Sequence, residues 1–468
     1  MDYNNNYYDN TKDEILFTSY QPGVQIHSGL VHKDELIDDY MKFLSTAKTE
    51  RLCVKEAVKI AESNGFKKYD NDADLKPGDK VYFTSRDKNF AAFIVGKNKS
   101  QTGFQLLGAH IDAPRIDVKQ KPLYENTDIA YFDTQYYGGI KKYQWTTTPL
   151  AIYGVIYKMD GTRIDVSIGD NPNDPVFCIT DLLPHLDRQS MSKKNAEDFI
   201  AGEKLDIIVG TLKKPDTEKD PVKARVLEWL EARYNVEEED LCSAELEIVP
   251  AGNARFSGFD KSLIAGYAQD DRVCAYTSLR ALVDISVIPD RTCGVVLVDK
   301  EEIGSTCASG AKSRWFEDIL RCMARPKNET LFANILYNTN MLSSDVTSAF
   351  DPLYADAFDK KSSARFGKGI MLSKYNGGRG KSGGADANPE FIAYVRNVLN
   401  RGNNDYQFDS MGKVDVGGGG TIASIISALN INVLDAGVPI LNMHSPMELA
   451  HVNDIYAAYR AYNSFALA

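Results

Sequence analysis

The C-terminal half of the sequence alternates helical and strand patterns, and this alternation most constrains the fold. Apolar side chains recur there every three to four residues in some segments and form short continuous runs in others, which is typical of amphipathic helices and buried strands respectively. Such an order favours a mostly parallel sheet with helices on both faces. We therefore predict an α/β fold, with helices over 271–284, 393–402 and 421–430 and strands over 292–299, 331–340 and 437–443.

The N-terminal part predicts the beginning of the same domain. The spacing of apolar residues over 30–65 indicates two amphipathic helices. We expect the second helix to end at Asn64-Gly65, because glycine commonly ends helices. Three strand patterns follow, over 81–85, 89–96 and 104–110.

A β-rich segment interrupts this α/β pattern. Residues 124–157 alternate aromatic and polar side chains, which favours antiparallel strands, and Asp160-Gly161 separates two strand patterns, as in a hairpin. A charged stretch follows, with an exposed helix expected over 221–234. We therefore expect a discontinuous α/β domain formed by residues 1–115 and 255–468, with an inserted β-rich domain at 116–254.

Charge and cysteine content exclude several classes of protein. The 468 residues include 54 Lys+Arg and 65 Asp+Glu, so the net charge of −11 gives no support for nucleic-acid binding. The sequence has neither an apolar run of the ~18 residues that span a membrane nor a signal-peptide pattern at its polar start. Seven cysteines, without a CxxC pair, favour reduced thiols. We expect a cytoplasmic protein with no membrane or nucleic-acid partner.

Histidines and carboxylates occur where the predicted strands end. In open α/β sheets, ligands bind outside the carboxyl ends of the strands, so we expect these side chains to converge at one edge. Imidazole and carboxylate groups are the ligands that a zinc-type metal site needs. The residues at these strand ends and at the start of the 271–284 helix are His110, Asp112, Asp270, Asp271, Glu301, Glu302, Asp345 and His444.

Each of these residues also has a purely structural interpretation. A single histidine after a strand is more often hydrogen-bonded than metal-bound. Asp270 and Asp271 fit an N-cap and a first-turn acid, which the helix dipole favours, while Asp345 fits a turn. Glu301 and Glu302 fit a solvated loop. The complete set nevertheless favours a metal site, because two adjacent acids after an apolar strand repel each other unless a cation or a shared proton relieves them.

The spacing of two pairs indicates how their roles divide. Side chains two residues apart on an extended segment lie on the same face, so Asp112 can accept the second ring N–H of a metal-bound His110. Side chains of adjacent residues point in opposite directions. In the Glu301-Glu302 pair, one carboxylate can therefore bind a metal while the other faces the substrate as a general base.

Seven short segments occur in order along the chain. Together they resemble the aspartyl aminopeptidase and vacuolar aminopeptidase I family of two-metal aminopeptidases, in its bacterial type, and the resemblance covers nearly the whole chain. The segments are Gly108-Ala109-His110-Ile111-Asp112-Ala113-Pro114-Arg115, Tyr137-Gly138-Gly139, Pro184-His185-Leu186, Gln269-Asp270-Asp271-Arg272, Asp299-Lys300-Glu301-Glu302-Ile303-Gly304-Ser305, Ser344-Asp345 and Met443-His444-Ser445.

The resemblance implies a catalytic domain of the zinc-peptidase type and a metallo-aminopeptidase that removes N-terminal residues from peptides. It also implies two divalent metal ions per subunit, usually Zn²⁺, with Co²⁺ or Mn²⁺ as alternatives. Matched position by position, His110 and Asp345 would bind one metal. Glu302 and His444 would bind the other metal, and Asp270 would bridge the two.

The resemblance also implies roles outside the set of metal ligands. Asp112 would orient His110, and Glu301 would act as the general acid/base. The insertion would be a dimerisation domain, and the dimers would assemble into a tetrahedral dodecamer. His185 would reach into the active site of the partner subunit.

The preferred N-terminal residue of the substrate stays open at this point. Acid-specific members of the family carry histidines shortly after the metal-binding aspartate, where this chain has Ser348 and Asp351. A basic residue that pairs with an acidic substrate side chain should fall near 376–381, and Arg379 and Lys381 are the candidates. A preference for Asp or Glu and a broader preference are therefore both alternatives.

Other functions are alternatives to the aminopeptidase. A two-metal deacylase or carboxypeptidase of the same fold would use almost the same ligands, and a non-catalytic assembly protein could keep the fold. The HExxH motif is absent, which excludes a thermolysin-like metalloprotease. The glycine run that includes Gly418 and Gly419 precedes a helix and could bind an anion; the resemblance implies instead that it lines the substrate pocket.

Overall fold

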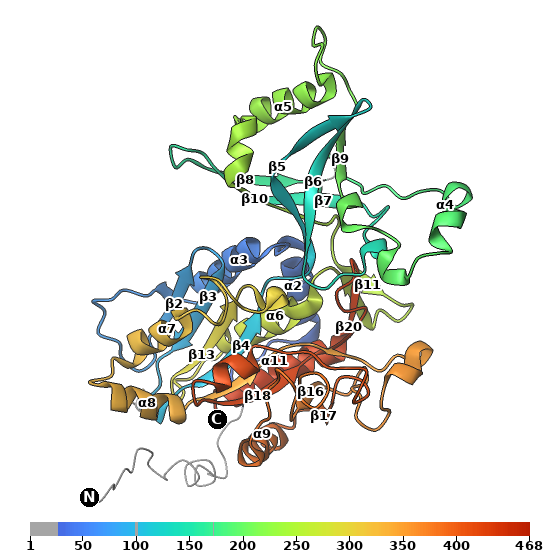
Figure 1. The fold of residues 1–468 in the computed structure, drawn as a ribbon. Coiled ribbons are helices and arrows are strands. Elements are labelled where there is room, and N and C mark those ends of the chain that lie inside the picture. The colour runs from blue at the N-terminus through green and yellow to red at the C-terminus, as the bar shows by residue number, and fades with distance from the viewer. Residues whose placement is uncertain (1–26, 99–101, 172) are drawn as a thin grey trace, which may run out of the picture. The chain divides into compact units, whose positions relative to one another are not determined.

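In the computed structural model, the chain is described over residues 27–98, 102–171 and 173–468 (Figure 1). Contacts within the chain divide it into two units. The first unit comprises Met1–Asp112, Ala254–Met443 and Glu448–Ala468, and the second comprises Ala113–Asn253 and His444–Met447.

A large sheet forms the centre of the first unit (Figure 1). Its four middle strands are parallel to one another, whereas the strands on either side of them run antiparallel to their inner neighbours. The mostly parallel sheet predicted from the sequence is therefore confirmed. Across the described residues the strand order is β1 (Lys67–Lys68), β2 (Lys80–Ser85), β3 (Asn89–Ile94), β13 (Cys293–Val298), β4 (Gln105–His110), β14 (Asn340–Ser343), β18 (Asn432–Gly437), β16 (Ile370–Ser373) and β17 (Tyr406–Phe408).

Helices cover both faces of this sheet, as the sequence predicts. Successive residues of β4 enter different apolar cores, with Leu107 in one and Leu106 in the other, because side chains alternate across a strand. The first core is completed by α2 (Lys33–Thr46), α3 (Glu50–Ser63), α6 (Gln269–Val283), α9 (Pro389–Arg401) and α11 (Val452–Ala466). The second core is completed by α7 (Trp315–Ala324), α8 (Glu329–Tyr337) and α10 (Ala423–Ser427).

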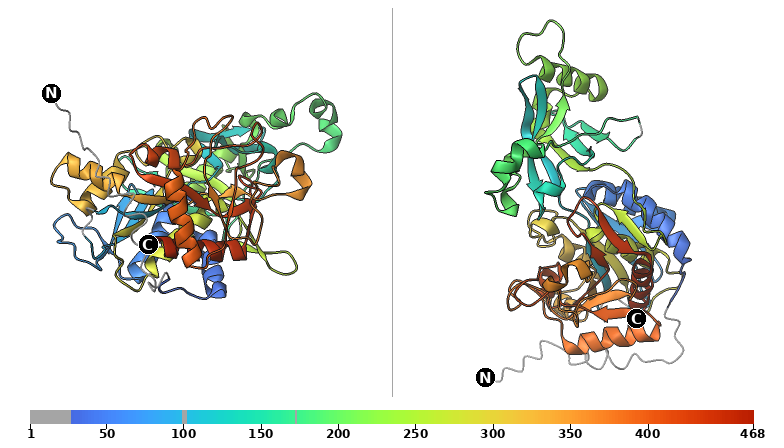
Figure 2. Two further views of the ribbon diagram at one scale, coloured as in Figure 1. Left: turned by 90° about the horizontal axis from the view of Figure 1, so that it is seen from below. Right: turned by 90° about the vertical axis from the view of Figure 1, so that its right-hand side faces the viewer.

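The last helix connects distant parts of the first unit. α11 packs against α6 and α9, and it can be followed in red in Figure 2. Its residues Tyr459, Tyr462 and Phe465 are buried. The same unit contains a smaller sheet, in which one strand directly precedes α6 in the chain and another directly precedes α11. Its strands are, in order, β11 (Arg255–Ser257), β12 (Leu263–Gly266), β20 (Glu448–His451), β19 (Pro439–Leu441) and β15 (Thr347–Ser348).

The second unit contains an antiparallel sheet. The predicted hairpin at Asp160-Gly161 is confirmed, because Tyr157 pairs with Arg163 across the turn. Helix α5 (Pro221–Tyr234) begins and ends at the predicted residues, and α4 (Pro184–Met191) belongs to the same unit. The strand order is β8 (Arg163–Ile168), β7 (Leu150–Tyr157), β10 (Ala244–Pro250), β5 (Arg115–Asn126), β6 (Ile129–Tyr137) and β9 (Ile207–Gly210).

The strand predicted over 331–340 is wrong. Residues up to Tyr337 form α8, and only Asn340 begins the strand β14. Asn328 caps the helix, since its side chain accepts a hydrogen bond from the backbone N–H of Leu331 at 2.8 Å. A short apolar run fits a buried strand and a buried helix equally well, and here the N-cap hydrogen bond stabilises the helix.

All seven cysteines are free thiols. Within 27–98, 102–171 and 173–468, no helix has both the length and the apolar composition that crossing a bilayer requires.

Candidate metal centre

The central parallel strands bring the predicted site residues of the first unit to one edge of the sheet. In the register of these strands, Val298 of β13 lies opposite His110, and Ser343 of β14 lies opposite Gly108. β4 ends with His110 itself, while the chain reaches the two glutamates and Asp345 shortly after β13 and β14 end. Parallel strands therefore deliver these side chains to the edge where ligands bind in such folds.

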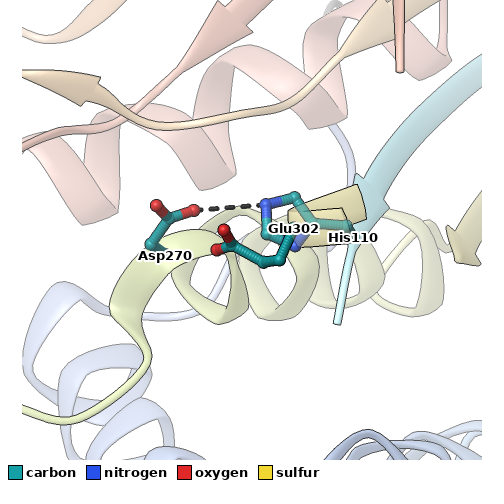
Figure 3. A group of neighbouring side chains, drawn as sticks. All are labelled: His110, Asp270 and Glu302. Atoms are coloured by element: carbon teal, nitrogen blue, oxygen red, sulfur yellow. Dashed lines mark ion pairs between the residues drawn. The ribbon is translucent and has the colours of Figure 1, made fainter. Parts of the chain in front are cut away.

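Two groups of ligand atoms meet at His110. One group consists of His110, Asp270 and Glu302, and the other of His110, Asp271 and Asp345; within each group the ligand atoms lie within 4.8 Å of one another. Nε2 of His110 is 3.2 Å from Oδ1 of Asp270 and 3.9 Å from Oδ1 of Asp345. Figure 3 shows Asp270 and Glu302 beside the imidazole ring.

Asp112 holds the other nitrogen of the ring. Nδ1 of His110 lies 3.4 Å from Oδ1 of Asp112 and 3.1 Å from the carbonyl oxygen of the same residue. The Asp112 carboxylate also accepts the backbone N–H groups of Glu301 at 3.0 Å and Glu302 at 3.2 Å. A single buried carboxylate thus orients both the ring and the segment that carries the two glutamates, which is how supporting groups orient metal ligands.

The charges around His110 favour a cation at this position. Burial lowers the pKa of His110, but hydrogen bonds with Asp112 and Asp270 and the charges of Asp345 and Asp271 together raise it well above its usual value. The pKa of Asp345 is raised well above its usual range, mainly by burial and by the charge of Asp271. Crowded buried carboxylates destabilise a fold unless positive charge offsets them. One imidazole with several carboxylates is also a donor set that zinc binds, so the residues fit a divalent metal.

The start of α6 positions Asp270 and excludes a capping role for it. The N-cap residue is Ala268, and no side chain caps the helix. Asp270 and Asp271 have non-helical backbone angles and are joined by a cis peptide bond. The backbone N–H of Asp270 donates to Oε2 of Glu448 at 3.0 Å, and the Glu448 carbonyl accepts from the Gln269 side chain at 2.7 Å.

The sequence places Asp271 at this edge without assigning it a part in the metal chemistry, and it does not point to Glu448 at all. Oδ2 of Asp271 accepts the backbone N–H of His110 at 3.3 Å, and Glu448 holds the backbone of Asp270. A part for Asp271 in the site could have been inferred from the sequence, because Asp271 adjoins Asp270 in one of the segments that carry the family resemblance. Glu448 could not have been found in this way, because nothing near it in the sequence indicates a contact with a residue 178 positions earlier.

Two predicted histidines belong to the second unit. His444 lies in the segment His444–Met447, and its Nδ1 is 2.9 Å from the carbonyl oxygen of Gly139. His185 is exposed near the start of α4. The first unit therefore brings together His110 with the predicted acidic ligands, and both of these histidines lie outside that unit.

A cavity of about 230 Å³ lies in the first unit beside this edge of the sheet. Val346, which directly follows Asp345 in the chain, is among its lining residues. Lys381 also lines the cavity, and its Nζ is 2.7 Å from Oδ2 of Asp386. The other predicted substrate-binding residues that line the cavity are Arg379, Gly418 and Gly419.

The sequence profile of the aminopeptidase I zinc metalloprotease family, M18, matches residues 43–466. The chain belongs to the M18 family. A probable M18 family aminopeptidase 1 of Clostridium acetobutylicum is 48% identical over 436 residues, which cover 92% of this chain and 93% of that protein. The crystal structure of an M18 aminopeptidase from Thermotoga maritima has a TM-score of 0.89 at 44% identity, covering 93% of this chain and 96% of that chain.

A more distant protein shares the M18 fold. The structure of the S. cerevisiae mApe1 dodecamer has a TM-score of 0.73 at 21% identity, and it covers 92% of this chain and 96% of that chain. The family resemblance predicted from the sequence is confirmed. This M18 protein is a metallo-aminopeptidase, and its family is one of zinc metalloproteases.

Proposed function

We propose that this M18 aminopeptidase removes N-terminal residues from peptides with two zinc ions and with Glu301 as general acid/base. The observation that carries the proposal is the convergence of two ligand groups on the buried His110, one with Asp270 and Glu302 and the other with Asp271 and Asp345. Two overlapping groups provide donors for a pair of ions, whereas a single structural ion needs only four ligands.

The proposed division of ligands between the two ions is the one that the family resemblance implies. His110 and Asp345 would hold one zinc, Glu302 and His444 would hold the other, and Asp270 would contribute to both. Support for the bridging role comes from the 3.2 Å distance between Asp270 and Nε2 of His110, together with the place of Asp270 in the Glu302 group. For His444, support comes from the contact of Nδ1 with a backbone carbonyl, which in metal-binding histidines directs Nε2 to the ion.

The chain's own residues supply proton transfer and orientation. When bound, zinc activates a water molecule and polarises the scissile carbonyl. Glu301 takes the proton of the attacking water and returns it to the leaving amine. Asp112 keeps this carboxylate in place, because it accepts the backbone N–H of Glu301 at 3.0 Å. The free α-amino group of the substrate binds beside the metal pair, so cleavage occurs after the first residue only.

We propose that the cavity accepts acidic and uncharged N-terminal side chains. Val346 and Met371 offer apolar contacts to an uncharged residue. Lys381 already lies 2.7 Å from Asp386, so Arg379 is the cation proposed to bind a carboxylate, with Gly418 and Gly419 lining the pocket beside it. Arg379→Ala should lower kcat/KM for aspartyl and glutamyl substrates more than for leucyl substrates, and Lys381→Ala should not.

Self-association is proposed for the second unit. The resemblance implies dimers that form a tetrahedral dodecamer, and the S. cerevisiae protein of the same fold is described as a dodecamer. Leu183, directly before α4, is 50% exposed, and Leu186, within α4, is 68% exposed. Clustered exposed apolar side chains mark association surfaces. His185 lies between the two leucines in the sequence, which supports its proposed contact with the active site of a partner subunit.

The test of the reaction replaces Glu301 alone. Glu301→Gln should lower kcat for aminoacyl substrates by a factor of about 10²–10⁴, while the zinc content measured by mass spectrometry stays unchanged. Unchanged turnover would remove Glu301 from the mechanism. The wild-type protein should be assayed in parallel on N-acyl substrates, because activity confined to those would instead identify a deacylase or carboxypeptidase.

A further inference from the structure

The segment 300–309, called here the glutamate loop, carries Glu301 and Glu302 in a strained backbone. Lys300, Ser305 and Cys307 have φ values of 72°, 58° and 72°, in the left-handed region that residues other than glycine avoid. Strained backbone of this kind persists only where surrounding contacts fix it. The contacts that fix the glutamate loop are therefore part of the machinery that positions its two carboxylates.

Asp299 connects the two ends of the glutamate loop. Its Oδ1 accepts the backbone N–H of Lys300 at 2.8 Å, where the loop leaves β13. Its Oδ2 accepts the hydroxyl of Ser309 at 2.7 Å, where the loop returns, and Asp299 pairs there with Gly310 as a parallel β-bridge. The Asp299 backbone N–H donates to the Asn89 side chain at 3.1 Å. One carboxylate thus closes the loop at its base.

A buried cation accompanies this carboxylate. Nζ of Lys88 lies 3.0 Å from Oε1 of Glu50 and 3.9 Å from Oδ2 of Asp299. The Lys88 side chain is 8% exposed, and those of Glu50 and Asp299 are fully buried. Lys300 adds a second positive charge, with Nζ 3.4 Å from Oδ2 of Asp299. Burial and the charges of Glu50 and Asp112 raise the pKa of Asp299 to about 6, and the two lysines oppose this rise. Buried carboxylates are tolerated when cations lie beside them in this way.

Two carboxylates consequently hold the glutamate loop. Asp112 accepts the backbone N–H groups of Glu301 and Glu302 near the start of the loop. Asp299 accepts hydrogen bonds from Lys300 and Ser309 at the two ends of the loop. We propose that Asp299 is a positioning residue of the aminopeptidase reaction. This inference rests on the proposed function, because Glu301 and Glu302 are the groups being positioned.

Asp299→Asn tests the proposal. The asparagine keeps the size of the side chain but removes its charge and weakens its hydrogen bonds. We expect kcat and zinc affinity each to fall about 10–100-fold, as for other residues that support metal ligands, with KM changed less than about twofold. Hydrogen exchange should become faster in peptides that cover 300–310. Unchanged kcat and zinc affinity would overturn the proposal, whatever happens to hydrogen exchange.

Asp454→Asn is the matched control. Asp454 is also fully buried in the first unit, and it accepts the backbone N–H groups of Gly367 and Gly369 at 2.8 Å each. Both replacements should lower the melting temperature, because each weakens buried hydrogen bonds. Asp454→Asn should nevertheless leave kcat, zinc affinity and hydrogen exchange of the glutamate loop unchanged. An equal loss of kcat in both variants would show that Asp299 acts only through general stability, and would overturn the proposal.

A milder variant keeps the proposal testable if Asp299→Asn does not fold. Ser309→Ala removes the hydrogen bond at one end of the loop and leaves the charge of Asp299 in place. It should lower kcat several-fold and accelerate exchange of the loop, whereas Ser309→Thr, which retains the hydroxyl, should restore both. Wild-type kcat in Ser309→Ala would overturn the proposal. Failure of the proposed function is recognised separately, by turnover in Glu301→Gln.

Discussion

Among single residues, Asp112 joins the parts of the metal centre most directly. Its carboxylate lies beside the ring of His110 and holds the backbone of Glu301 and Glu302. We predict that Asp112→Asn lowers zinc affinity about 10–100-fold, because supporting groups of metal ligands have effects of this size. Competition with a chromogenic chelator measures the change. Asp260→Asn, at an exposed aspartate that accepts the backbone N–H and the hydroxyl of Ser262, is the control; equal zinc affinities in the two variants would contradict the prediction.

The pH dependence of zinc binding follows from the acids around His110. Burial lowers the pKa of His110, but hydrogen bonds with Asp112 and Asp270 and the charges of the neighbouring carboxylates together raise it well above its usual value. At any pH below this raised pKa the ring holds a proton on a nitrogen that zinc requires, so proton and metal compete. We predict that zinc affinity rises steadily between about pH 6 and pH 8. Affinity that is flat over this range would contradict the prediction; isothermal titration in two buffers also measures the protons released.

At this scale the sequence predicts the residues that follow strands and misses those that only tertiary structure brings near. His110 and Glu302 follow apolar strand patterns, and the rule for parallel sheets is sufficient to bring them together. Glu448 reaches Asp270 from β20, a strand of a different sheet. Lys88 reaches Asp299 from the turn before β3. No local pattern encodes either contact, so both required the structure.

Among elements, α8 shows where pattern alone is insufficient. Leu331, Phe332, Ile335 and Leu336 form a short apolar group that fits a buried strand or a buried helix. The structure forms a helix whose N-cap is Asn328. The strand β18 was not predicted at all, because the expected helix over 421–430 and strand over 437–443 left its residues between two elements.

The cap of α8 can be tested independently of the active site. We predict that Asn328→Ala lowers the free energy of unfolding by about 0.5–2 kcal/mol, because it removes the acceptor for the backbone N–H of Leu331. Asn328→Asp keeps an acceptor and should retain the stability of the wild type. Urea unfolding measures the difference, and kcat should be unchanged in both variants. Equal loss of stability in the two variants would contradict the capping role.

For the whole molecule, self-association is predicted only by the family resemblance and not by the residue pattern itself. Apolar side chains that will be covered in an assembly look the same in a single sequence as ordinary exposed ones. In the described second unit, Leu182, Leu183 and Leu186 are each at least half exposed and lie together in the chain. Their proximity to His185 makes α4 the element whose surface we expect to contact another subunit.

A charged substitution on α4 tests this expectation. We predict that Leu186→Glu reduces the molar mass of the particle in light scattering coupled to size-exclusion chromatography, because burying a charge in an apolar contact is unfavourable. Activity should fall in parallel if His185 completes a partner's site. Met159→Glu, at another exposed apolar residue of the second unit, 95% exposed, should keep the wild-type mass. An unchanged mass for Leu186→Glu would exclude α4 from the interface.

Anomalous scattering from crystals of the zinc-loaded protein tests the proposed metal pair most directly. The account predicts two zinc peaks per subunit, about 3.5–4 Å apart. The carboxylate of Asp270 should lie within about 2.2 Å of both, with His110 and Asp345 on one ion and Glu302 and His444 on the other. A single peak, or a pair of peaks with Asp270 bound to neither, would contradict it.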